Sequence, residues 1–442
     1  MDNEVRHRRR VATAAGLAAA VEWYDYFIFG VAAALVFGRQ FYPADDPVAG
    51  VLASFATFAA GFAARPLGGI IAGHLGDKRG RKPMLVGALV IMGLSTTAIG
   101  LLPTYQSVGI LAPILLLVLR LLQGLAVGAQ WGGAVLLATE YAPPGKRGLY
   151  SSFVQLGVPI GVVLANTVFL LAVQVTGAGF ASWGWRIPFL VGVLVLVLAW
   201  YIHTRVDETP EFRAAEAKLA AQEKRGSPLG IVLRKHLGTV LLAGGSFAVN
   251  TATFNILLTG VLDYATRHLH LPRSSILTIT ILVSLTQFVV IPFAARLSDR
   301  VPRIRIYAVG AVGLLVWAVP MFLLIDTANY AAIIVASLVA STFMSIMYGP
   351  QAALFAELFT PEMRYTGASL GYQIAAVFGG GLAPFIMVLL LESTGTSMSV
   401  SLYLIVLAVL ALFSIAVLAR RAREAATETR QPPSGTPSTL EA

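Results

Sequence analysis

Residues 73–82 read Gly73-His74-Leu75-Gly76-Asp77-Lys78-Arg79-Gly80-Arg81-Lys82, a charged stretch between two long apolar runs. A weaker copy occurs in the second half of the chain, where residues 295–303 place Asp299 at the position of Asp77 and Arg303 at that of Arg81. A second pair of segments, residues 140–147 and 357–364, shares one spacing between a glutamate and an arginine. A repeat of about half the chain length, with basic loops in equivalent places, indicates two halves built on one plan.

The composition is that of a membrane protein. Hydrophobic residues make up 57% of the 442-residue chain and charged residues only 12%, whereas soluble domains carry about 25% charged residues. Apolar runs of about 20 residues recur along the chain, and each is long enough to cross a ~30 Å hydrocarbon core as a helix. The first run lacks a small-residue cleavage site, so it is interpreted as a span and not as a signal peptide.

We therefore predict an all-α membrane protein with twelve transmembrane helices. The spans are placed at residues 11–37, 48–73, 84–103, 108–139, 148–175, 184–203, 238–263, 275–295, 305–325, 329–357, 365–391 and 399–419.

The basic residues indicate the topology. With both termini in the cytoplasm, the loops on that side and the central linker carry all but six of the 32 lysines and arginines, as the positive-inside rule requires. The net charge of +10 therefore reflects topology and contact with anionic lipid, and not nucleic-acid binding. The six exceptions are Arg39, Arg186, Arg267 and Arg273, expected at the outer face, and Arg65 and Arg120, expected within the membrane.

The expected organisation is two bundles of six helices. The bundles span residues 1–203 and 238–420 and are joined by a charged cytoplasmic linker, 204–237. We expect the tail, residues 421–442, to be disordered in the cytoplasm, because its end is polar and rich in proline. The protein is expected to be a monomer in the cell membrane.

Several segments together resemble the major facilitator superfamily and, within it, the metabolite:proton symporter family. The charged loop between spans 2 and 3 carries the superfamily likeness. The finer likeness lies in residues 21–26 (Val-Glu-Trp-Tyr-Asp-Tyr), 65–69 (Arg-Pro-Leu-Gly-Gly), 120–134, 183–189 (Trp-Gly-Trp-Arg-Ile-Pro-Phe) and 208–212 (Glu-Thr-Pro-Glu-Phe). The resemblance covers about residues 15–420. It implies bacterial inner-membrane symporters for carboxylates such as shikimate, 2-oxoglutarate and citrate, or for zwitterions such as proline and betaine.

One residue departs from the family pattern. Where the family reads Gly-Gly-Glu in span 4, this chain reads Gly128-Ala129-Gln130. Gln130 cannot carry a proton. If the glutamate is a coupling or substrate group in relatives, this chain uses another acid, handles a different substrate or is less tightly coupled.

Two carboxylates of span 1 are candidates for proton coupling. An ionisable group inside a span costs about 2.5–3.5 kcal/mol on insertion scales, so each such residue is expected to have a functional or structural role. Asp25 and Tyr26 follow Glu22 at i+3 and i+4, which gives one polar stripe. Burial favours the protonated form of such a carboxyl. The alternative is a structural acid paired with an arginine of a neighbouring helix.

Two intramembrane arginines, Arg120 and Arg65, are the candidates for binding an anionic substrate. The guanidinium offers forked donors that suit a carboxylate. The alternative makes both arginines counter-ions of Glu22 and Asp25. The neutral or aromatic candidates for the same site are Tyr26, Gln123, Gln130, Trp131, Asn250, Asn255, Gln351, Tyr372 and Gln373.

Gly124, Gly128 and Gly132 recur at i+4 steps in span 4. We expect this strip to allow a neighbouring helix to approach closely. A phosphate-binding loop is not expected, because no strand precedes the glycines.

The charged loop and its equivalents are expected to form a cytoplasmic gate. Asp77 lies at a helix end and can meet the positive N-terminus of a helix in the other half, for which the span that begins near Arg364 is the candidate. In the superfamily, this contact holds the outward-facing state closed on the cytoplasmic side. The predicted gate residues are Gly73, Asp77, Lys78, Gly80, Arg81, Lys82, Glu140, Arg147, Asp299, Arg300, Glu357 and Arg364.

The leading interpretation is a secondary transporter that imports a small organic acid or zwitterion with protons, by alternating access and without a cofactor or metal. The alternatives are an exporter working as a proton antiporter, faintly indicated by Gly157-Val-Pro-Ile-Gly161, and an uncoupled facilitator. An enzyme is not expected, since the chain has no cysteine and its six histidines fall at span ends or in loops.

Overall fold

The computed structural model describes residues 19–43, 46–79, 81–128, 147–205, 234, 236–359 and 364–428, with only the backbone for a few of them, including 72–85 and 364–366. All regular structure in these ranges is helical.

The first half begins with a helical span, Ala19–Gln40. Its C-terminal part contains a π-helical segment, η1 (Ala33–Phe37), and ends in α2 (Gly38–Gln40). The remaining helices of this half are α3 (Pro47–Arg79), α4 (Arg81–Leu101), α5 (Tyr105–Val108), α6 (Leu111–Gly128), α8 (Arg147–Gln155), α9 (Gly157–Thr176), η2 (Gly177–Phe180), η3 (Gly184–Arg186), α10 (Ile187–Leu190) and α11 (Val193–Arg205).

The second half repeats this plan. Its first span also contains a π-helical segment, η4 (Ile256–Gly260), between α14 (Leu237–Asn255) and α15 (Val261–Arg267). The helices that follow are α16 (Arg273–Leu297), α17 (Arg303–Ile325), α18 (Tyr330–Glu357), α19 (Arg364–Ala375), η5 (Ala376–Gly381), α20 (Ala383–Thr394) and α21 (Met398–Glu428).

The twelve predicted spans are confirmed. In the described ranges, 11 helical stretches are long and apolar enough to cross a membrane, and a shorter apolar helix, Val86–Leu101, lies within α4. Each coincides with a predicted span. One difference lies at the end of the chain, where α21 continues as a helix to Glu428, into the stretch expected to be disordered. An ion pair one helical turn apart, Arg420 to Glu424 at 2.8 Å, supports this extension.

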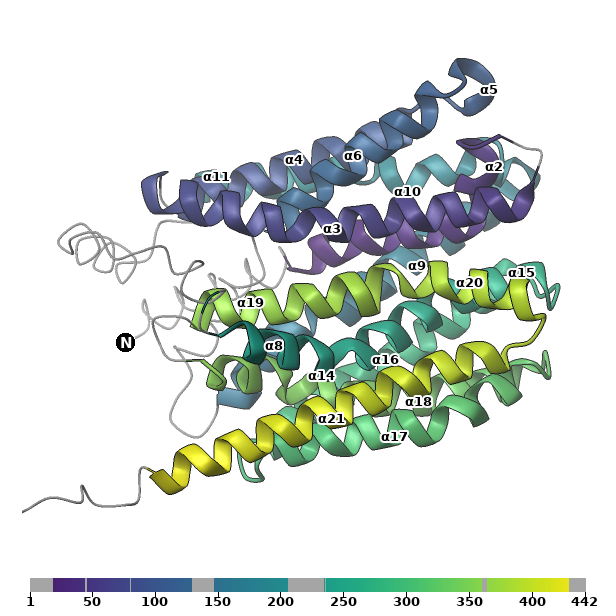
Figure 1. The fold of residues 1–442 in the computed structure, drawn as a ribbon. Helices are drawn as coiled ribbons and strands as arrows, with labels where there is room; N and C mark the ends of the chain where they lie inside the picture. Colours follow the sequence, from purple (N-terminus) through teal and green to yellow (C-terminus); the bar gives the residue numbers. More distant parts are fainter. Residues whose placement is uncertain are drawn as a thin grey trace, which may run out of the picture.

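The helices run side by side between two faces (Figure 1). At one face α3 ends at Arg79, α8 begins at Arg147 and α17 begins at Arg303. We call this the basic face, and the other end of the bundle the opposite face. In Figure 1, α3, α4, α6 and α11 lie in the upper part and α14, α16, α17, α18 and α21 in the lower part. Two helices of the first half pack against the second half, α8 along α18 and α9 along α16.

Close helix contact at the predicted glycine strip is confirmed for its two described members. A Cβ atom on Gly124 would lie 2.0 Å from the carbonyl oxygen of Gly61, and one on Gly128 would lie 1.9 Å from that of Arg65. Only glycine therefore lets α6 approach the backbone of α3 at these points. This approach sets the position of α3, and with it that of Arg65.

Large apolar side chains cover much of the surface. Val175, Val289 and Phe293 are each more than half exposed. Such an apolar exterior suits lipid as the surrounding solvent. Many polar side chains of the spans, including Asp25, Arg120 and Asn250, are buried inside the bundle instead.

Candidate functional site

A central cavity lies between the two halves. Its volume is about 50 Å³, enough for one or a few water molecules but not for an organic acid. The first half contributes Trp23, Tyr26, Phe62, Arg65 and Val158, and the second half contributes Phe247, Asn250, Thr251, Phe254, Asn255, Gln287, Ile291, Met344, Ser345, Tyr348, Tyr372, Ala376 and Gly380.

Arg65 is the single charged side chain among the described residues that line this cavity. Its guanidinium carbon lies 4.3 Å from the ring centre of Phe62 and 5.1 Å from that of Tyr26. These rings hold the cation by attraction to their π faces without occupying its N–H donors. The donors of Arg65 are therefore available to a ligand in the cavity.

Tyr26 joins the halves at the cavity. Its hydroxyl donates to Asn255 Oδ1 at 2.5 Å, and Asn255 Nδ2 donates to the Thr251 carbonyl at 2.9 Å. A hydrogen bond between the first and the seventh span at the cavity wall is well placed to break when the halves separate.

Asp25 lies behind this wall, fully buried inside the first half. Its Oδ1 accepts hydrogen bonds from the Thr96 hydroxyl and, at 3.1 Å, from Gln123 Nε2. Gln123 Oε1 in turn accepts from Arg120 at 3.2 Å. In the described part of the chain, Gln123 thus connects Asp25 to Arg120, and no direct ion pair joins them.

Arg120 faces the interior of the first half and does not line the cavity. Its guanidinium carbon lies 4.3 Å from the ring centre of Phe29 and 5.1 Å from that of Phe58. Its Nε is buried and has no hydrogen-bond partner. The structure therefore places the two candidate arginines in different surroundings, Arg65 at the cavity and Arg120 beside the Asp25 network.

Glu22 is buried one turn before Asp25, and its charge interacts with those of Arg65 and Asp25. All four of these ionisable side chains belong to the first half. Two acids and two arginines give a formally neutral group when both acids are ionised.

The other predicted binding residues fall into three groups. Asn250, Asn255 and Tyr372 line the cavity. Gln351 and Gln373 are buried away from it, and Gln351 accepts a hydrogen bond from Gln155 of the first half at 3.0 Å. Gln130 and Trp131 lie outside the described residues.

At the basic face, Asp299 binds the start of a helix in the other half. Its Oδ1 accepts from the backbone N–H of Gly148 at 2.8 Å and its Oδ2 from that of Leu149 at 3.1 Å. Both donors belong to the first turn of α8, where free N–H groups and the helix dipole favour a negative charge. The geometry is the repeat-related equivalent of the contact predicted for Asp77.

Arg303 extends this contact within the second half. It lies 3.2 Å from Asp299 and 2.5 Å from Glu357. Arg147 and Arg300 are exposed at the same face. The other predicted gate residues, or their side chains, lie outside what the structure describes: Gly73, Asp77, Lys78, Gly80, Arg81, Lys82, Glu140 and Arg364.

Contacts between the halves lie on both sides of the cavity. Toward the basic face, Gln155 Nε2 donates to the Tyr348 carbonyl at 3.2 Å. Toward the opposite face, a Cβ atom on Gly30 would lie 2.6 Å from the Thr259 side chain. The π-helical segments η1 and η4 also meet there. These contacts hold the two halves together on both sides of a small cavity, so movement of one half against the other is required to admit a substrate.

We predict that Asp299→Asn slows turnover. Asparagine keeps one acceptor oxygen but loses the negative charge, whose interaction with a helix N-terminus is worth about 0.3–2 kcal/mol, or about 2–30-fold in an equilibrium constant. The state closed at the basic face loses that stabilisation, so initial uptake rates should fall by a similar factor while the amount of protein in the membrane is unchanged. Glu424→Gln is the matched control, since it removes an ion pair at the same face within one helix. Equal rates for Asp299→Asn and the parent protein would contradict this role.

Several residues of the site escaped the sequence prediction. Thr96 lies in a Ser-Thr-Thr run and Gln155 follows two serines, so each is one of several polar residues in its span and no motif distinguishes it. Arg303 is not among the predicted gate residues. Its alignment with Arg81 in the internal repeat is the signal that would have identified it. Tyr348 gave no distinguishing signal, because aromatic residues are common in these spans.

Comparison with known proteins agrees with this architecture. Residues 11–227 match the family described as sugar (and other) transporter, and residues 242–440 match the Major Facilitator Superfamily. Each match covers about one half, as expected for a duplicated fold.

Similar proteins extend over nearly the whole chain. The shikimate transporter of Escherichia coli (strain K12) is 40% identical over 400 residues, which cover 90% of this chain and 91% of that protein. An inner membrane metabolite transport protein of the same organism is 38% identical over 417 residues, 93% of this chain and 94% of that protein. The proline/betaine transporter of this strain is 34% identical over 413 residues, 92% of this chain and 82% of that protein.

Solved structures share the fold. A D-xylose–proton symporter superposes with a TM-score of 0.71 at 16% identity, covering 92% of this chain and 96% of that structure. A partially occluded, inward-open xylose transporter from Escherichia coli also gives 0.71 at 16% identity, covering 96% of this chain and 98% of that structure.

The fold and the central cavity define a multi-pass membrane transporter and not an enzyme. The chain belongs to the major facilitator superfamily and, within it, to the metabolite:proton symporter family.

Proposed function

We propose that this transporter imports a small organic carboxylate together with protons across the bacterial cell membrane. The observation that carries the proposal is the arrangement of two separate charged groups in the first half. Arg65 faces the cavity, and Asp25 is linked through Gln123 to Arg120 behind it.

Arg65 is assigned to the substrate carboxylate. Guanidinium–carboxylate pairs form two parallel hydrogen bonds, which give both affinity and orientation. The similar proteins named for shikimate and for proline and betaine act on molecules that share a carboxylate group. A cationic cavity wall suits that shared group, and the neutral amides and hydroxyls of the second half suit the remainder of a substrate.

Asp25 is assigned to the proton, with Glu22 as the second acid. When both acids are ionised, the four charged groups sum to zero, so a substrate anion would add an uncompensated charge in a low-dielectric interior. Protonation of one acid leaves a net charge of +1, which a monoanion neutralises. This charge balance favours binding of proton and carboxylate together.

Gln123 connects the protonation of Asp25 with the position of Arg120. Its amide donates to Asp25 and accepts from Arg120, an orientation that matches an ionised Asp25. A proton on Asp25 removes the demand for that donor and loosens the hold on Arg120. The buried network therefore has a different set of hydrogen bonds in the protonated and unprotonated states, as a coupling element requires.

We further propose that the basic face lies in the cytoplasm with both termini, following the positive-inside rule. The two halves then rock around the central cavity. The Asp299 contact closes the cytoplasmic side, and the η1–η4 contact closes the outer side. The transporter is proposed to work as a monomer surrounded by lipid.

The deciding experiment uses purified full-length protein in liposomes that contain a pH-sensitive dye. Shikimate, dicarboxylates, aromatic acids, proline and betaine are added in turn. Proton entry that follows addition of a carboxylate supports symport. Entry of labelled substrate without proton movement favours a facilitator, and proton exit when substrate is loaded inside favours the antiporter alternative.

A further inference from the structure

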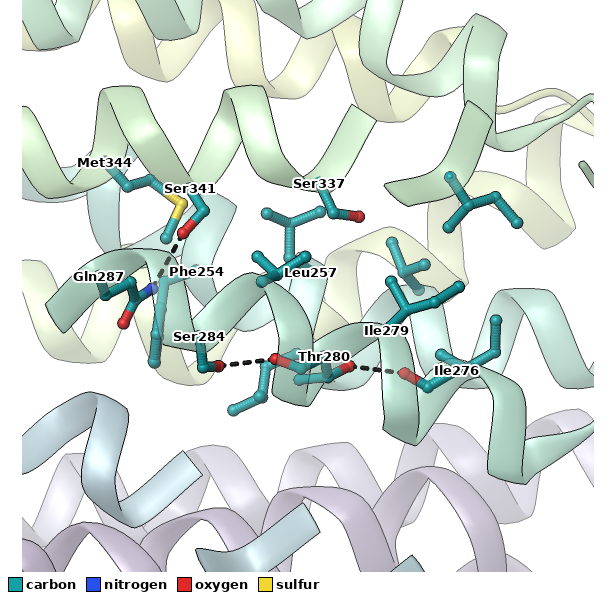
Figure 2. A pocket seen from close by; sticks show the side chains of 14 residues that line it. Phe254, Leu257, Ile276, Ile279, Thr280, Ser284, Gln287, Ser337, Ser341 and Met344 are labelled. Carbon is teal, nitrogen blue, oxygen red and sulfur yellow. Dashed lines mark hydrogen bonds between the residues drawn. The ribbon is translucent and has the colours of Figure 1, made fainter. Parts of the chain in front are cut away.

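A second pocket adjoins the central cavity within the second half (Figure 2). We call it the side pocket. It has a volume of about 30 Å³ and is enclosed by the seventh span, α16 and α18. Phe254, Gln287 and Met344 line both spaces, so the side pocket continues the central cavity. It extends to Ile276 and Ile333, near the starts of α16 and α18 at the opposite face.

The polar lining of the side pocket is uncharged and rich in hydroxyl groups. Its members are Thr280, Ser284, Gln287, Ser337 and Ser341. A carboxylate or an ammonium group would find no opposite charge among them. Neutral polar groups of a ligand are the chemistry that this lining matches.

The hydrogen bonds within the side-pocket lining show which donors and acceptors remain available to a ligand. The Thr280 hydroxyl donates to the Ile276 carbonyl at 2.9 Å and the Ser284 hydroxyl to the Thr280 carbonyl at 2.7 Å, so each presents only oxygen lone pairs to the pocket. Gln287 Nε2 donates to Ser341 Oγ at 3.2 Å, and the amide oxygen of Gln287 remains available as an acceptor.

Ser337 is the unpartnered member of the set. Its side chain is 6% exposed, and it has no hydrogen-bond partner in the described part of the chain. Figure 2 shows it among the residues that line the pocket, without a dashed line to another side chain. A hydroxyl that has no partner and lies at the wall of a pocket can donate a hydrogen bond to a ligand and accept one from it.

We propose that the side pocket binds hydroxyl groups of a hydroxylated carboxylate whose acid group is bound at Arg65. The proposal rests on the proposed function of the central cavity and narrows its substrate class. A substrate hydroxyl both donates and accepts. It therefore gives its proton to the oxygens of Gln287, Thr280 or Ser284 and receives one from Ser337 or Ser341.

The same lining disfavours a betaine. A trimethylammonium group has no hydrogen-bond donor or acceptor and is bulkier than a hydroxyl. It would leave Ser337 unpaired and would bring no donor for the lone pairs of Thr280 and Ser284. In the proposed orientation the side pocket lies on the outer side of the cavity, so it would act while substrate binds from outside.

The test compares two acids that differ only in their hydroxyl groups. Full-length protein in liposomes is given a trihydroxylated cyclohexenecarboxylate or the unsubstituted cyclohexenecarboxylate, and KM is taken from the initial rate of proton entry. We expect the hydroxylated acid to have a KM lower by about tenfold or more, because a site built to bond a hydroxyl rejects the analogue that lacks it.

Two variants, one on α16 and one on α18, remove single hydroxyl groups from the pocket lining. Thr280→Val and Ser337→Ala should each raise KM for the hydroxylated acid by about 3–10-fold and leave the unsubstituted acid unchanged. Thr278→Val is the matched control, because Thr278 is exposed on α16 and its hydroxyl also bonds to its own helix, at 2.8 Å from the Ser274 carbonyl. It should change neither value.

The outcomes distinguish this inference from the function on which it rests. If neither acid drives proton entry but another carboxylate of the panel does, the side pocket is not a hydroxyl site although the symport stands. If no carboxylate drives proton entry, the proposed symport is wrong. If both acids drive proton entry with equal KM, or betaine has the lowest KM, the side pocket is not a hydroxyl site although the symport stands. Should a variant fold poorly, the comparison of the two acids on the parent protein still decides.

Discussion

Asp25→Asn abolishes accumulation of substrate against a gradient while leaving downhill exchange in place. Asparagine retains the shape of the side chain and can accept from Thr96 and Gln123, but it cannot bind a proton. With an imposed difference of about two pH units and one proton per substrate, the parent protein can concentrate substrate about 100-fold. The variant should reach a ratio of about one.

The measurement uses labelled substrate in proteoliposomes, once with a pH gradient and once as exchange at equal pH inside and outside. Exchange needs the empty carrier neither to reorient nor to release its proton, so it should survive in Asp25→Asn. Glu392→Gln is a suitable control, because Glu392 is a partly exposed acid that pairs with Arg267 outside the cavity. Uphill accumulation by Asp25→Asn would show that Asp25 does not carry the coupled proton, and Glu22 would then be the candidate.

The internal repeat explains why the fold could be predicted from the sequence. An apolar run that crosses the membrane must satisfy its backbone hydrogen bonds internally, which a helix does. The basic loops then indicate on which side of the membrane each connection between spans lies. Gly124 and Gly128 also revealed a helix contact, because small residues at i+4 steps serve few other purposes inside a span. These are properties of single helices and short loops.

The candidate site was predictable only in its composition. From the sequence, Asp25, Arg65, Arg120 and Gln123 are predicted site residues, because a polar or charged side chain inside a span is energetically costly and is retained for a function or a structural contact. It did not show that Gln123 bridges Asp25 and Arg120, since that depends on how α6 is rotated against the first span. Helix rotation is set by packing across the whole bundle, which no single span encodes.

Contacts between the halves were the least predictable part. Gln155 and Gln351 meet across the interface, although they belong to different repeats and have no shared motif. The Asp299 contact with α8 was predictable by symmetry from the expectation for Asp77, because a carboxylate at a helix end and a free helix N-terminus attract each other in either half. The internal repeat therefore predicts the Asp299 contact, whereas no motif predicts the contact between Gln155 and Gln351.

The different positions of the two arginines lead to the second large effect, a loss of substrate affinity in Arg65→Gln. Removal of one partner from a buried, hydrogen-bonded charge pair costs about 2–5 kcal/mol, so the dissociation constant for a carboxylate should rise by about 30-fold or more. Arg65→Lys keeps the charge but loses the forked donors, and we expect it to lose about tenfold. Binding to the purified protein is measured by calorimetry.

Two further arginines make the assignment of Arg65 specific. Arg273→Gln removes a guanidinium that lies 5.8 Å from the ring centre of Phe180, outside the cavity, and should leave affinity unchanged. Arg120→Gln removes the partner of Gln123 and should alter the pH dependence of transport more than affinity, because its guanidinium is held between Phe29 and Phe58 inside the first half. If Arg120→Gln weakened binding as much as Arg65→Gln, both arginines would have to reach the substrate. The first half would then need to repack when the carrier opens, and rigid rocking of the two halves would not describe its cycle.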